Sequence, residues 1–508
     1  MLVTTTAGLG CVVFLAFGAA SPQVDYSEEL FLQVEGLSED PRVFEEPSSA
    51  QSLALKWLAE EDEYKVDASD TAAVQSRYSL AVLYFATNGA SQWLRTLRFL
   101  SPEHECYWND DNRGAFCDDD PESTSLVVEE LIVDSNNLRG SVPVELSTLS
   151  ALKTFDLGDN RLTGTLPSYD FGMLESLILD RNTLESSIPE SFANMTQLKV
   201  LDLSVNLLES SPPEDILSLT NMQVLRLGHN RLTGLGEKVA VLSNLRELNL
   251  TSNQFEGNID FLKSLSHLEV MDLSSNKFDA NLEYDKFSTM RNLTTMVLAN
   301  NQIVGPVPSS LGRLSKLSYL NVARNLLTGT FPWASFPQSN LARVIMADNL
   351  FEGQLPLDIF RFTALKALNF DRNHLSGIIP LGIGGSSSLE SLQVAGNDLA
   401  GELPASLGNL EALSILDVSD NRLNGSLPQS LSNLSNLRLL DVHGNLFSGT
   451  VPRGIEEYDV VERIALQDNN ITGFIDFLCT IISQPIISAD CAGQEPQVVC
   501  TCCDICLQ

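Results

Sequence analysis

Basic side chains are scarce in this sequence. Lys and Arg number 31 of the 508 residues against 66 Asp and Glu, which gives a formal net charge of −35. A nucleic-acid backbone requires dense Lys and Arg, and an anionic membrane surface repels negative charge, so this balance excludes both as partners. Aromatic residues are also few, at 7%, but apolar residues make up 44% of the chain. That content supplies a core and excludes a chain that is disordered throughout.

Long apolar runs are missing apart from one near the N-terminus. Ala7–Ala20 is apolar and ends in small residues, which offer a signal-peptidase site before Ser21. We interpret residues 1–20 as a signal peptide, because the run is too short to span a bilayer comfortably. This predicts a secreted, extracellular protein. No Lys or Arg precedes the run, so two alternatives stay open: a start codon placed too late, and an uncleaved signal anchor that would hold the protein at the cell surface.

Cysteine is rare in the body of the chain. Cys11 lies in the N-terminal run, and the other eight cysteines lie in groups toward the two ends: Cys106, Cys117, Cys479, Cys491, Cys500, Cys502, Cys503 and Cys506. An even number in a secreted chain predicts disulfides that staple its ends. The last four cysteines can also be interpreted as a zinc or redox cluster. Zinc usually takes its ligands from two separated pairs, so we favour disulfides and predict no metal site and no cofactor.

The N-terminal fifth of the chain has no repeat. Residues 21–50 are acidic and contain three prolines, which predicts a flexible spacer. Residues 51–122 predict a helical cap. Ser49 or Ser52 caps a first helix, and Asp70 caps a second one. A third short helix is expected around Trp93, Leu97 and Leu100, and it would be followed by an acidic loop that contains the first two cysteines.

A single pattern, L-x-L-x-x-N-x-L-x-G, recurs through residues 123–477 at intervals of 22 to 25 residues. Its asparagines are Asn136, Asn160, Asn182, Asn206, Asn230, Asn253, Asn276, Asn301, Asn325, Asn349, Asn373, Asn397, Asn421, Asn445 and Asn469. This period is typical of leucine-rich repeats and predicts an α/β solenoid of about fifteen coils with a parallel sheet on its concave side. The remaining residues, 478–508, predict a cysteine-rich C-terminal cap.

The residue types of one coil explain the geometry. In LKTFDLGDNRLTG, Leu152, Phe155, Leu157 and Leu162 point inward, and the residues between them alternate outward. One coil cannot bury such a stripe alone, but stacked coils bury it against each other, at roughly 1.5–3 kcal/mol for each fully covered Leu. The asparagine turns inward after the strand, where its amide satisfies backbone groups of the turn. We therefore interpret the asparagines as a structural ladder.

The continuation of each coil has the form L-x-G-x-[IVL]-P, as in GSVPVEL, GTLPSYDF, GPVPSSL and GELPASL. It resembles the plant-type class of leucine-rich repeats, which occurs in receptor-like kinases, receptor-like proteins and polygalacturonase inhibitors. The segments LAVLYFATNGASQW and CYWNDDNRGAFC are similar to the N-terminal cap of that class. The closing ADCAGQEPQVVCTCCDICLQ resembles cysteine-tailed repeat proteins of diatoms and related algae. The resemblance covers residues 51–508 and is specific for fold but weakly specific for ligand.

The sequence departs from the plant-type class in two respects. The motif proline is missing from three central coils (GLGEKV, GNIDFL and ANLEYD) and from the last (GFIDFL), so we expect the curvature to change near residues 234–283. No kinase motif follows the repeats.

We expect Cys106 to pair with Cys117 and Cys479 with Cys491. Six C-terminal cysteines nevertheless permit fifteen connectivities, and the sequence does not choose among them.

Nothing in the sequence points to catalysis. The five histidines occupy repeat or cap positions without a nucleophile motif, and paired carboxylates need a shielded cleft that an open concave face does not offer. We therefore predict no catalytic residues. The concave face instead carries a few cations among many acids, and our candidate ligand-binding residues are Arg226, Tyr319, Arg324, Arg343 and Arg372. Such cations hold a carboxylate, sulfate or acidic sugar. Pairing with Asp348 and Asp371 is the alternative, and we favour it slightly.

Six N-x-S/T sequons are candidate glycosylation sites: Asn194, Asn249, Asn292, Asn424, Asn433 and Asn470. The sequence as a whole predicts a recognition scaffold that binds an extracellular peptide, protein or polysaccharide on its concave face. Its expected role is cell-surface signalling with a co-receptor, or inhibition of another protein. The alternative is a structural or adhesive component of an extracellular matrix or cell wall.

Overall fold

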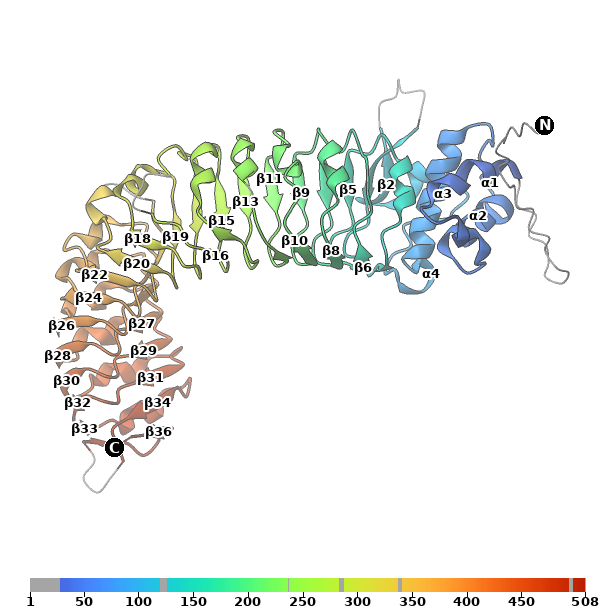
Figure 1. Cartoon of the computed structure of the whole chain (residues 1–508). Coiled ribbons are helices and arrows are strands. Elements are labelled where there is room, and N and C mark those ends of the chain that lie inside the picture. The colour runs from blue at the N-terminus through green and yellow to red at the C-terminus, as the bar shows by residue number, and fades with distance from the viewer. Residues whose placement is uncertain are drawn as a thin grey trace, which may run out of the picture.

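The computed structural model describes residues 28–118, 126–235, 237–282, 287–336, 340–492 and 497–507. The expected signal peptide lies outside the described residues. Within them, the chain forms a long solenoid with a helical unit at its N-terminal end, and the axis of the solenoid turns partway along (Figure 1). In these same residues no helix has both the length and the apolar character needed to cross a bilayer.

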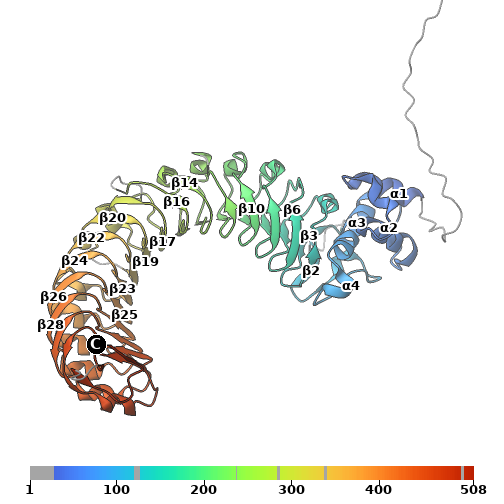
Figure 2. The same cartoon turned by 60° about the horizontal axis from the view of Figure 1, so that its bottom comes forward.

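The concave side of the solenoid is a parallel sheet to which each expected coil contributes one strand (Figure 2). Neighbouring strands pair in register with equivalent residues opposite each other, as Leu320 and Val344 are. The strands are β3 (Val128–Ile132), β5 (Thr154–Asp156), β7 (Ser176–Ile178), β9 (Val200–Asp202), β11 (Val224–Arg226), β13 (Glu247–Asn249), β15 (Val270–Asp272), β17 (Thr295–Val297), β19 (Tyr319–Asn321), β21 (Arg343–Ile345), β23 (Ala367–Asn369), β25 (Ser391–Gln393), β27 (Ile415–Asp417), β29 (Leu439–Asp441) and β31 (Arg463–Ala465).

A second set of parallel strands follows the asparagine of each coil. These strands are β4 (Arg139–Gly140), β6 (Arg161–Thr165), β8 (Thr183–Ser186), β10 (Leu207–Ser210), β12 (Arg231–Leu232), β14 (Glu256–Gly257), β16 (Lys277–Phe278), β18 (Val304–Pro306), β20 (Leu326–Gly329), β22 (Leu350–Gly353), β24 (His374–Gly377), β26 (Asp398–Glu402), β28 (Arg422–Ser426), β30 (Leu446–Gly449) and β32 (Asn470–Ile471).

Short 3₁₀ turns complete the circuit of most coils. They are η5 (Val144–Thr148), η6 (Glu190–Asn194), η7 (Ile216–Ser218), η8 (Glu237–Val241), η9 (Asp260–Ser264), η10 (Ser309–Arg313), η11 (Trp333–Ser335), η12 (Ile359–Arg361), η13 (Leu381–Gly385), η14 (Ala405–Asn409), η15 (Gln429–Asn433), η16 (Arg453–Glu457) and η17 (Asp476–Thr480). The apolar residues inside the coils form one continuous buried cluster from Leu30 to Val498. The predicted leucine-rich-repeat solenoid with a shared interior is thus confirmed.

The asparagine ladder is confirmed, and it bonds each coil to the one before. The Nδ2 of Asn349 donates to the carbonyl oxygens of Met346 (3.1 Å) and Ala347 (3.2 Å) in its own coil and of Val322 (3.0 Å) in the preceding coil. Its Oδ1 accepts from the backbone N–H of Leu327, also in the preceding coil, at 3.0 Å. One buried amide therefore bonds four backbone groups in two coils. It satisfies the N–H of Leu327, and it adds a hydrogen bond to carbonyls that also accept from Asn325, Asn373 and the N–H of Arg324.

The ladder ends against the two caps. The amide of Asn136 faces the N-terminal cap, where its Oδ1 accepts from the N–H of Arg95 at 2.7 Å and its Nδ2 donates to the carbonyl of the same residue at 2.9 Å. Beyond the last coil, the carboxylate of Asp490 accepts from the N–H groups of Asp468 (2.9 Å) and Asn469 (3.2 Å). Each cap thus supplies the hydrogen bonds that a further coil would have made.

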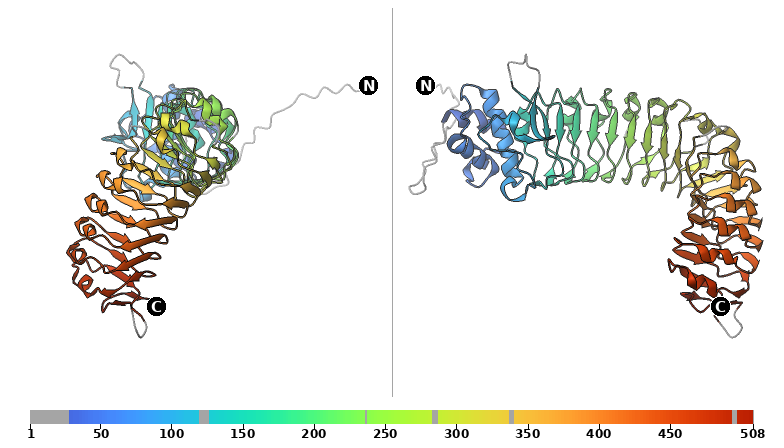
Figure 3. Two further views of the ribbon diagram at one scale, coloured as in Figure 1. Left: turned by 90° about the vertical axis from the view of Figure 1, so that its left-hand side faces the viewer. Right: turned by 180° about the vertical axis from the view of Figure 1, so that it is seen from behind.

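The second set of strands is interrupted where the motif proline is missing. Within the described residues, β4 to β12 form one sheet, β14 pairs only with β16, and β18 to β32 form another sheet. A single bridge between Asn281 and Val304 spans the second gap. The axis of the solenoid turns next to these gaps, between β16 and β22 (yellow to orange in Figure 1, and seen from behind in Figure 3). The turn lies just beyond the segment in which we expected a change of curvature.

The N-terminal cap consists of α1 (Glu28–Val34), η1 (Glu35–Leu37), η2 (Pro41–Glu45), α2 (Ala50–Lys56), the π-helical turn η3 (Trp57–Glu61), α3 (Thr71–Ala86), α4 (Gly89–Gln92), η4 (Glu105–Tyr107), β1 (Asn109–Asp110) and β2 (Arg113–Cys117). Two predicted helix starts are confirmed. The Ser49 hydroxyl accepts from the N–H of Ser52 at 3.0 Å, and the Asp70 carboxylate accepts from the N–H of Ala73 at 3.1 Å. β2 pairs antiparallel with β3 and covers the first edge of the concave sheet.

The cap differs from the sequence prediction in two places. From Glu28 onward, the expected flexible spacer of residues 21–50 is helical, and Val34 is fully buried against the cap. The third helix expected around Trp93, Leu97 and Leu100 does not form. Leu97 and Leu100 have positive φ angles, which a helix does not tolerate. The apolar spacing there instead packs Trp93 and Phe99 against the ring of Tyr84.

A buried arginine joins the elements of the cap. The Arg77 guanidinium is inaccessible to solvent and donates to both carboxylate oxygens of Asp62, each at 2.7 Å. It also lies over the rings of Trp57 and Trp108, at 5.2 and 4.7 Å from their centroids. Planar stacking together with a bidentate ion pair is a geometry that Arg provides and Lys does not.

Disulfides close both ends. The predicted Cys106–Cys117 pair is confirmed. The predicted Cys479–Cys491 pair is wrong: at the C-terminus Cys479 pairs with Cys502, Cys491 with Cys506, and Cys500 with Cys503. Two further strands, β34 (Ile486–Ala489) and β36 (Ile505–Cys506), extend the concave sheet, and β33 (Gly473–Phe474) pairs with β35 (Val498–Val499). Pairing of Ala489 with Cys506 brings Cys506 next to Cys491, which explains the observed bond.

We predict that Asn349→Ala lowers the free energy of unfolding by about 2–4 kcal/mol, because it takes the hydrogen-bond acceptor from the buried N–H of Leu327 and removes one hydrogen bond from each of three carbonyls. Asn436→Ala is the matched control, since its exposed amide donates only one hydrogen bond, to the carbonyl of Glu411. That variant should lose no more than about 1 kcal/mol. Urea unfolding followed by fluorescence measures both, and equal losses in the two variants would contradict the ladder's role.

Candidate ligand-binding surface

The N-terminal arm of the concave face is acidic. Successive coils place Asp134, Asp156, Asp180 and Asp202 on or just after the strands. Burial, together with a smaller effect of the charges of the other three carboxylates, raises the pKa of Asp156 to about 6. Burial also raises the pKa of Asp180. Asp134 is the exception, because its bidentate bond to the Arg113 guanidinium, with both contacts at 2.6 Å, holds its pKa below the ordinary value.

Arg226, the first candidate ligand-binding residue, is already engaged within this acidic arm. Its guanidinium donates to both carboxylate oxygens of Glu247, at 2.6 and 2.7 Å, and to Asp202 at 3.2 Å. A ligand anion would have to displace these two neighbours. We therefore place Arg226 among the residues that hold adjacent coils together.

The other four candidates lie on adjacent coils at the turn of the axis. The guanidinium of Arg343 lies over the ring of Tyr319, 4.4 Å from its centroid. Within the described residues, Arg343 has no carboxylate partner. Ala299, Ala323 and Ala347 occupy equivalent positions just after the neighbouring strands β17, β19 and β21. This part of the face thus combines a stacked cation with side chains too small to obstruct a ligand backbone.

Arg324 and Arg372 pair with a neighbouring carboxylate, which is the alternative to ligand binding that we favoured. Arg372 forms a bidentate ion pair with Asp348, with Nη2 at 2.9 Å from Oδ2, and Arg324 lies 3.6 Å from the same carboxylate. The bond to Arg372 lowers the pKa of Asp348. Asp371 forms no such pair in the described structure: its Oδ1 accepts from the backbone N–H of Ala395 at 2.8 Å. Burial raises the pKa of Asp371 to about 6.

The C-terminal arm is acidic again and contains a histidine. The Nδ1 of His443 lies 2.5 Å from Asp441, and its Nε2 lies 3.3 Å from Asp420. Burial lowers the pKa of His443, but the hydrogen bond to Asp441 and the nearby acidic charges raise it above the ordinary value overall. Burial raises the pKa of Asp417 in the neighbouring coil. The turn of the axis therefore separates two acidic stretches of the concave face.

The sequons differ in accessibility. Asn194, Asn424, Asn433 and Asn470 are exposed, whereas Asn249 and Asn292 are partly buried. Asn249 is the last residue of β13, and its Oδ1 accepts from the N–H of Thr251 at 3.1 Å. A glycan on Asn249 would cover the concave face of the N-terminal arm and leave the coils at the turn open.

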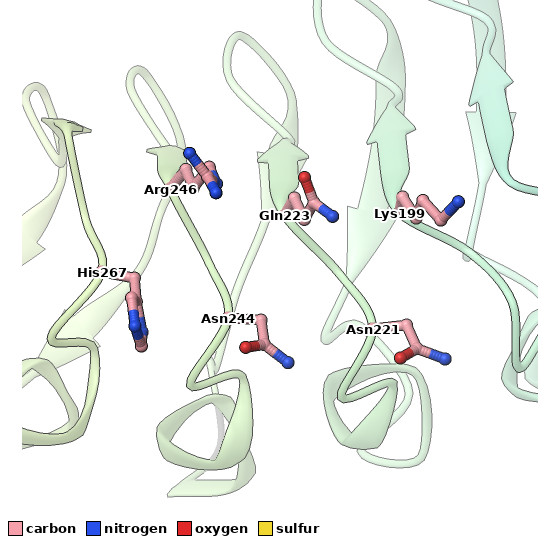
Figure 4. A pocket seen from close by; sticks show the side chains of 6 residues that line it. All are labelled: Lys199, Asn221, Gln223, Asn244, Arg246 and His267. Carbon is pink, nitrogen blue, oxygen red and sulfur yellow. The ribbon is translucent and has the colours of Figure 1, made fainter.

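Sequence reasoning missed a polar hollow on the edge of the solenoid that leads into the concave strands. Its volume is about 330 Å³, and two rows of side chains line it (Figure 4): Lys199, Asn221, Gln223, Asn244, Arg246 and His267. The Nδ2 of Asn244 donates to the carbonyl of Thr220 at 2.8 Å, and the Nδ1 of His267 lies 2.8 Å from the carbonyl of Ser243. The available signal was a second, less regular series of asparagines that precede the strands, as in NMQVLRL and NLRELNL.

Among the described residues, one group of three His, Cys, Asp or Glu side chains is close enough to share a metal ion, and it lies in the cap. The group comprises His104, Cys106 and Cys117. Its two sulfur atoms are joined in a disulfide and are therefore not thiolate ligands.

Comparisons with known proteins identify the repeats. Three leucine-rich-repeat family models match parts of the chain. The model Leucine rich repeat matches residues 173–232 and 266–327, the model Leucine Rich repeats (2 copies) matches 220–264, and the model Leucine Rich Repeat matches 388–410 and 412–434. No curated protein matches the chain.

Several solved structures are similar to this one. The plant peptide hormone receptor RGFR1 in complex with RGF2 is 26% identical with a TM-score of 0.62, and the match covers 71% of this chain and 63% of that one. The Arabidopsis receptor kinase HAESA, in complex with the peptide hormone IDA and the co-receptor SERK1, is 31% identical with a TM-score of 0.63 and coverages of 70% and 60%. A TDR receptor is 27% identical with a TM-score of 0.67, and the match covers 72% of this chain and 64% of that one. The chain spans less than two thirds of each of these receptors.

We predict that Asp156→Asn stabilises the fold at pH 7.5 by about 1 kcal/mol, after allowance for solvent screening. Between its ordinary pKa and about 6, the folded protein holds this proton more tightly than the unfolded chain does, so the carboxyl destabilises the fold increasingly as the pH rises through that window. At pH 4 the advantage of the variant should vanish. Thermal unfolding at both pH values measures the difference in stability between the variant and the parent protein.

Asp134→Asn is the control of opposite sign. Its lowered pKa means that the ionised carboxylate stabilises the fold at pH 7.5, and that this contribution is lost as the pH falls through the folded-state pKa. This variant should therefore be less stable than the parent protein at pH 7.5. If both variants shift stability in the same direction there, the account of the acidic arm is wrong.

Proposed function

We propose that this chain, a leucine-rich-repeat solenoid similar in fold to plant receptor ectodomains, is an extracellular recognition scaffold. It binds a peptide on the concave face at the turn of the axis, and it acts in cell-surface signalling with a co-receptor. The observation that carries the proposal is the stack of Arg343 on Tyr319 beside Ala299, Ala323 and Ala347. It combines an accessible cation, an aromatic surface and room for a ligand backbone.

The electrostatics of the face favour this location over the rest of the sheet. Arg226 and Arg372 are neutralised by carboxylates on adjacent coils, whereas Arg343 is not paired with a carboxylate in the described structure. The acidic arms on both sides repel a purely anionic chain. A peptide with basic residues toward its ends and an acidic or carboxamide group near its centre complements this distribution.

The similar structures support the class of ligand. RGFR1 is described in complex with RGF2, and HAESA in complex with the peptide hormone IDA and the co-receptor SERK1. Those descriptions apply to those proteins. For this chain they favour a peptide over a polysaccharide on the concave face, and they make a co-receptor the partner to look for.

Binding is tested by panning a displayed library of random linear peptides against the purified chain. We predict that Tyr319→Ala with Arg343→Ala weakens the best selected peptide by about 10-fold or more, because the substitutions remove the stacked cation and its platform. Arg463→Ala changes a concave cation at the far end, on β31, and should leave the affinity within about two-fold.

Two results would contradict the proposal. One is equal loss of peptide affinity in the double variant and in Arg463→Ala. The other is that no peptide is selected and the chain associates only in bulk with salt or calcium, which is the behaviour expected of a matrix or cell-wall component.

Secretion is a separate part of the proposal. It rests on the apolar run at residues 7–20 and on the disulfides at both ends. We predict that N-terminal sequencing of the exported protein starts at Ser21. An intact Met1 on membrane-bound protein would instead identify the run as an anchor.

A further inference from the structure

A second hollow adjoins the one in Figure 4, farther along the same edge of the solenoid. Its volume is about 790 Å³, and its lining consists of Ser266, Ser288, Thr289, Arg291 and Arg313. The two hollows meet where Ser266 and His267 are neighbours in sequence. Among the described residues, neither hollow is lined by Asp or Glu, although the chain contains 66 acidic residues against 31 basic ones.

Arg291 and Arg313 are the cations of this edge that are available to a ligand. Both side chains are exposed, and within the described part of the chain neither has a carboxylate partner. The two cations of the first hollow are engaged: Lys199 lies 2.6 Å from Glu175, and Arg246 lies 3.0 Å from Glu269. On a chain of net charge −35, two guanidinium groups on neighbouring coils that no described carboxylate pairs with form a local site for an anion.

The neutral groups of the edge are held in place by the backbone. The Nδ2 of Asn221 donates to the carbonyl of Thr196 at 2.9 Å, as Asn244 does to Thr220 and His267 to Ser243. Holding coils together is therefore the first role of these side chains. The same bonds fix a row of amide and imidazole groups whose remaining polar atoms face the hollow, so a ligand need not order them on binding.

The two hollows together span the coils from Asn206 to Asn325. Strands of neighbouring coils lie about 4.8 Å apart, so five steps give an edge site on the order of 24 Å long. This is an elongated site, with its unpaired cations at one end and amides along the remainder. Its shape suits a linear polymer better than a single small anion.

We propose that this edge binds a linear anionic polysaccharide, with Arg291 and Arg313 holding its carboxylate or sulfate groups. Asn221, Gln223 and Asn244 then bond the sugar hydroxyls. A planar guanidinium matches the paired oxygens of either anion. The site is separate from the concave face and does not depend on the peptide proposal.

Two observations favour a polysaccharide over an acidic peptide here. Among the described residues, neither hollow is lined by an aliphatic, Phe, Tyr or Trp side chain, so a peptide finds no apolar pocket for an anchoring side chain. The adjacent concave strands, from β9 to β19, are already paired on both sides, so no free strand edge accepts an extended backbone. A row of amides that leads to hydroxyl and guanidinium groups is complementary to a hydroxylated polyanion.

The net negative charge of the protein does not prevent this. At physiological ionic strength the Debye length is about 8 Å, so carboxylates beyond that range are largely screened at the site. Two carboxylates beside the first hollow, Glu175 and Glu269, are already paired with Lys199 and Arg246.

The experiment is a calorimetric titration of the full chain with three oligosaccharides of matched length: a polygalacturonate, a sulfated galactan and a neutral β-glucan. Arg291→Gln with Arg313→Gln removes the two unpaired cations. The matched control is Arg161→Gln with Arg231→Gln. These change two exposed cations on the second set of strands, β6 and β12, that also lack a carboxylate partner in the described residues. Thermal unfolding confirms that both double variants fold.

We expect the chain to bind at least one of the two acidic oligosaccharides and not the neutral one. The edge variant should bind about 10-fold more weakly or worse, while the control stays within about two-fold. Preference for the polygalacturonate or the galactan then identifies the anion as carboxylate or sulfate. The proposal is overturned if neither acidic oligosaccharide binds, or if both double variants lose affinity equally. Poly-glutamate is titrated in the same way as an acidic peptide, and binding to the edge as tight as that of the oligosaccharides would also overturn the proposal.

Discussion

The asparagine amide at the turn after each concave strand is the interaction on which this solenoid depends. It is the only ordinary side chain of its size that both donates two hydrogens and accepts at an oxygen within one rigid plane. At Asn349 this geometry satisfies carbonyls of two coils and an N–H of the earlier one. Leucine packing drives the coils together, but the amide sets the rotation of one coil on the next. The curvature of the concave face follows from that repeated relation.

Because the backbone and interior are held in this way, outward-facing residues are left to vary in charge and size. The chain uses that freedom unevenly. Aspartates accumulate on both arms of the concave face, and a stacked arginine and small side chains occupy the turn. On the edge that leads into the strands, the described residues that line the two hollows include no Asp or Glu. Distinct chemistries therefore lie on one scaffold at fixed distances from one another.

The fold was predictable because its determinants are local and repeated. The inward Leu and Asn positions recur in every coil, so a period of 24 is visible without knowledge of contacts. Features that occur once were harder. Cys491 pairs with Cys506 because β34 and β36 align, which no spacing reveals, and the apolar residues near Trp93 pack as an aromatic cluster, although their spacing imitates a helix. For the candidate ligand-binding residues, the sequence could not tell which cations are free of carboxylates: Arg343 is accessible, but Arg226 is neutralised by Glu247, a partner from another coil.

The gaps in the second set of strands have a mechanical consequence. Elsewhere each coil is tied to its neighbours along two hydrogen-bonded rows, one on either side of the interior, and such a pair resists bending as the two flanges of a beam do. At two places the described structure keeps the concave row but loses the strand pairing of the other row. Between β12 and β14 the bond from the N–H of Gln254 to the carbonyl of Leu232 remains, and between β16 and β18 one bridge and a few backbone bonds around it remain. We therefore expect the arc to open and close mainly beside the turn rather than evenly along its length.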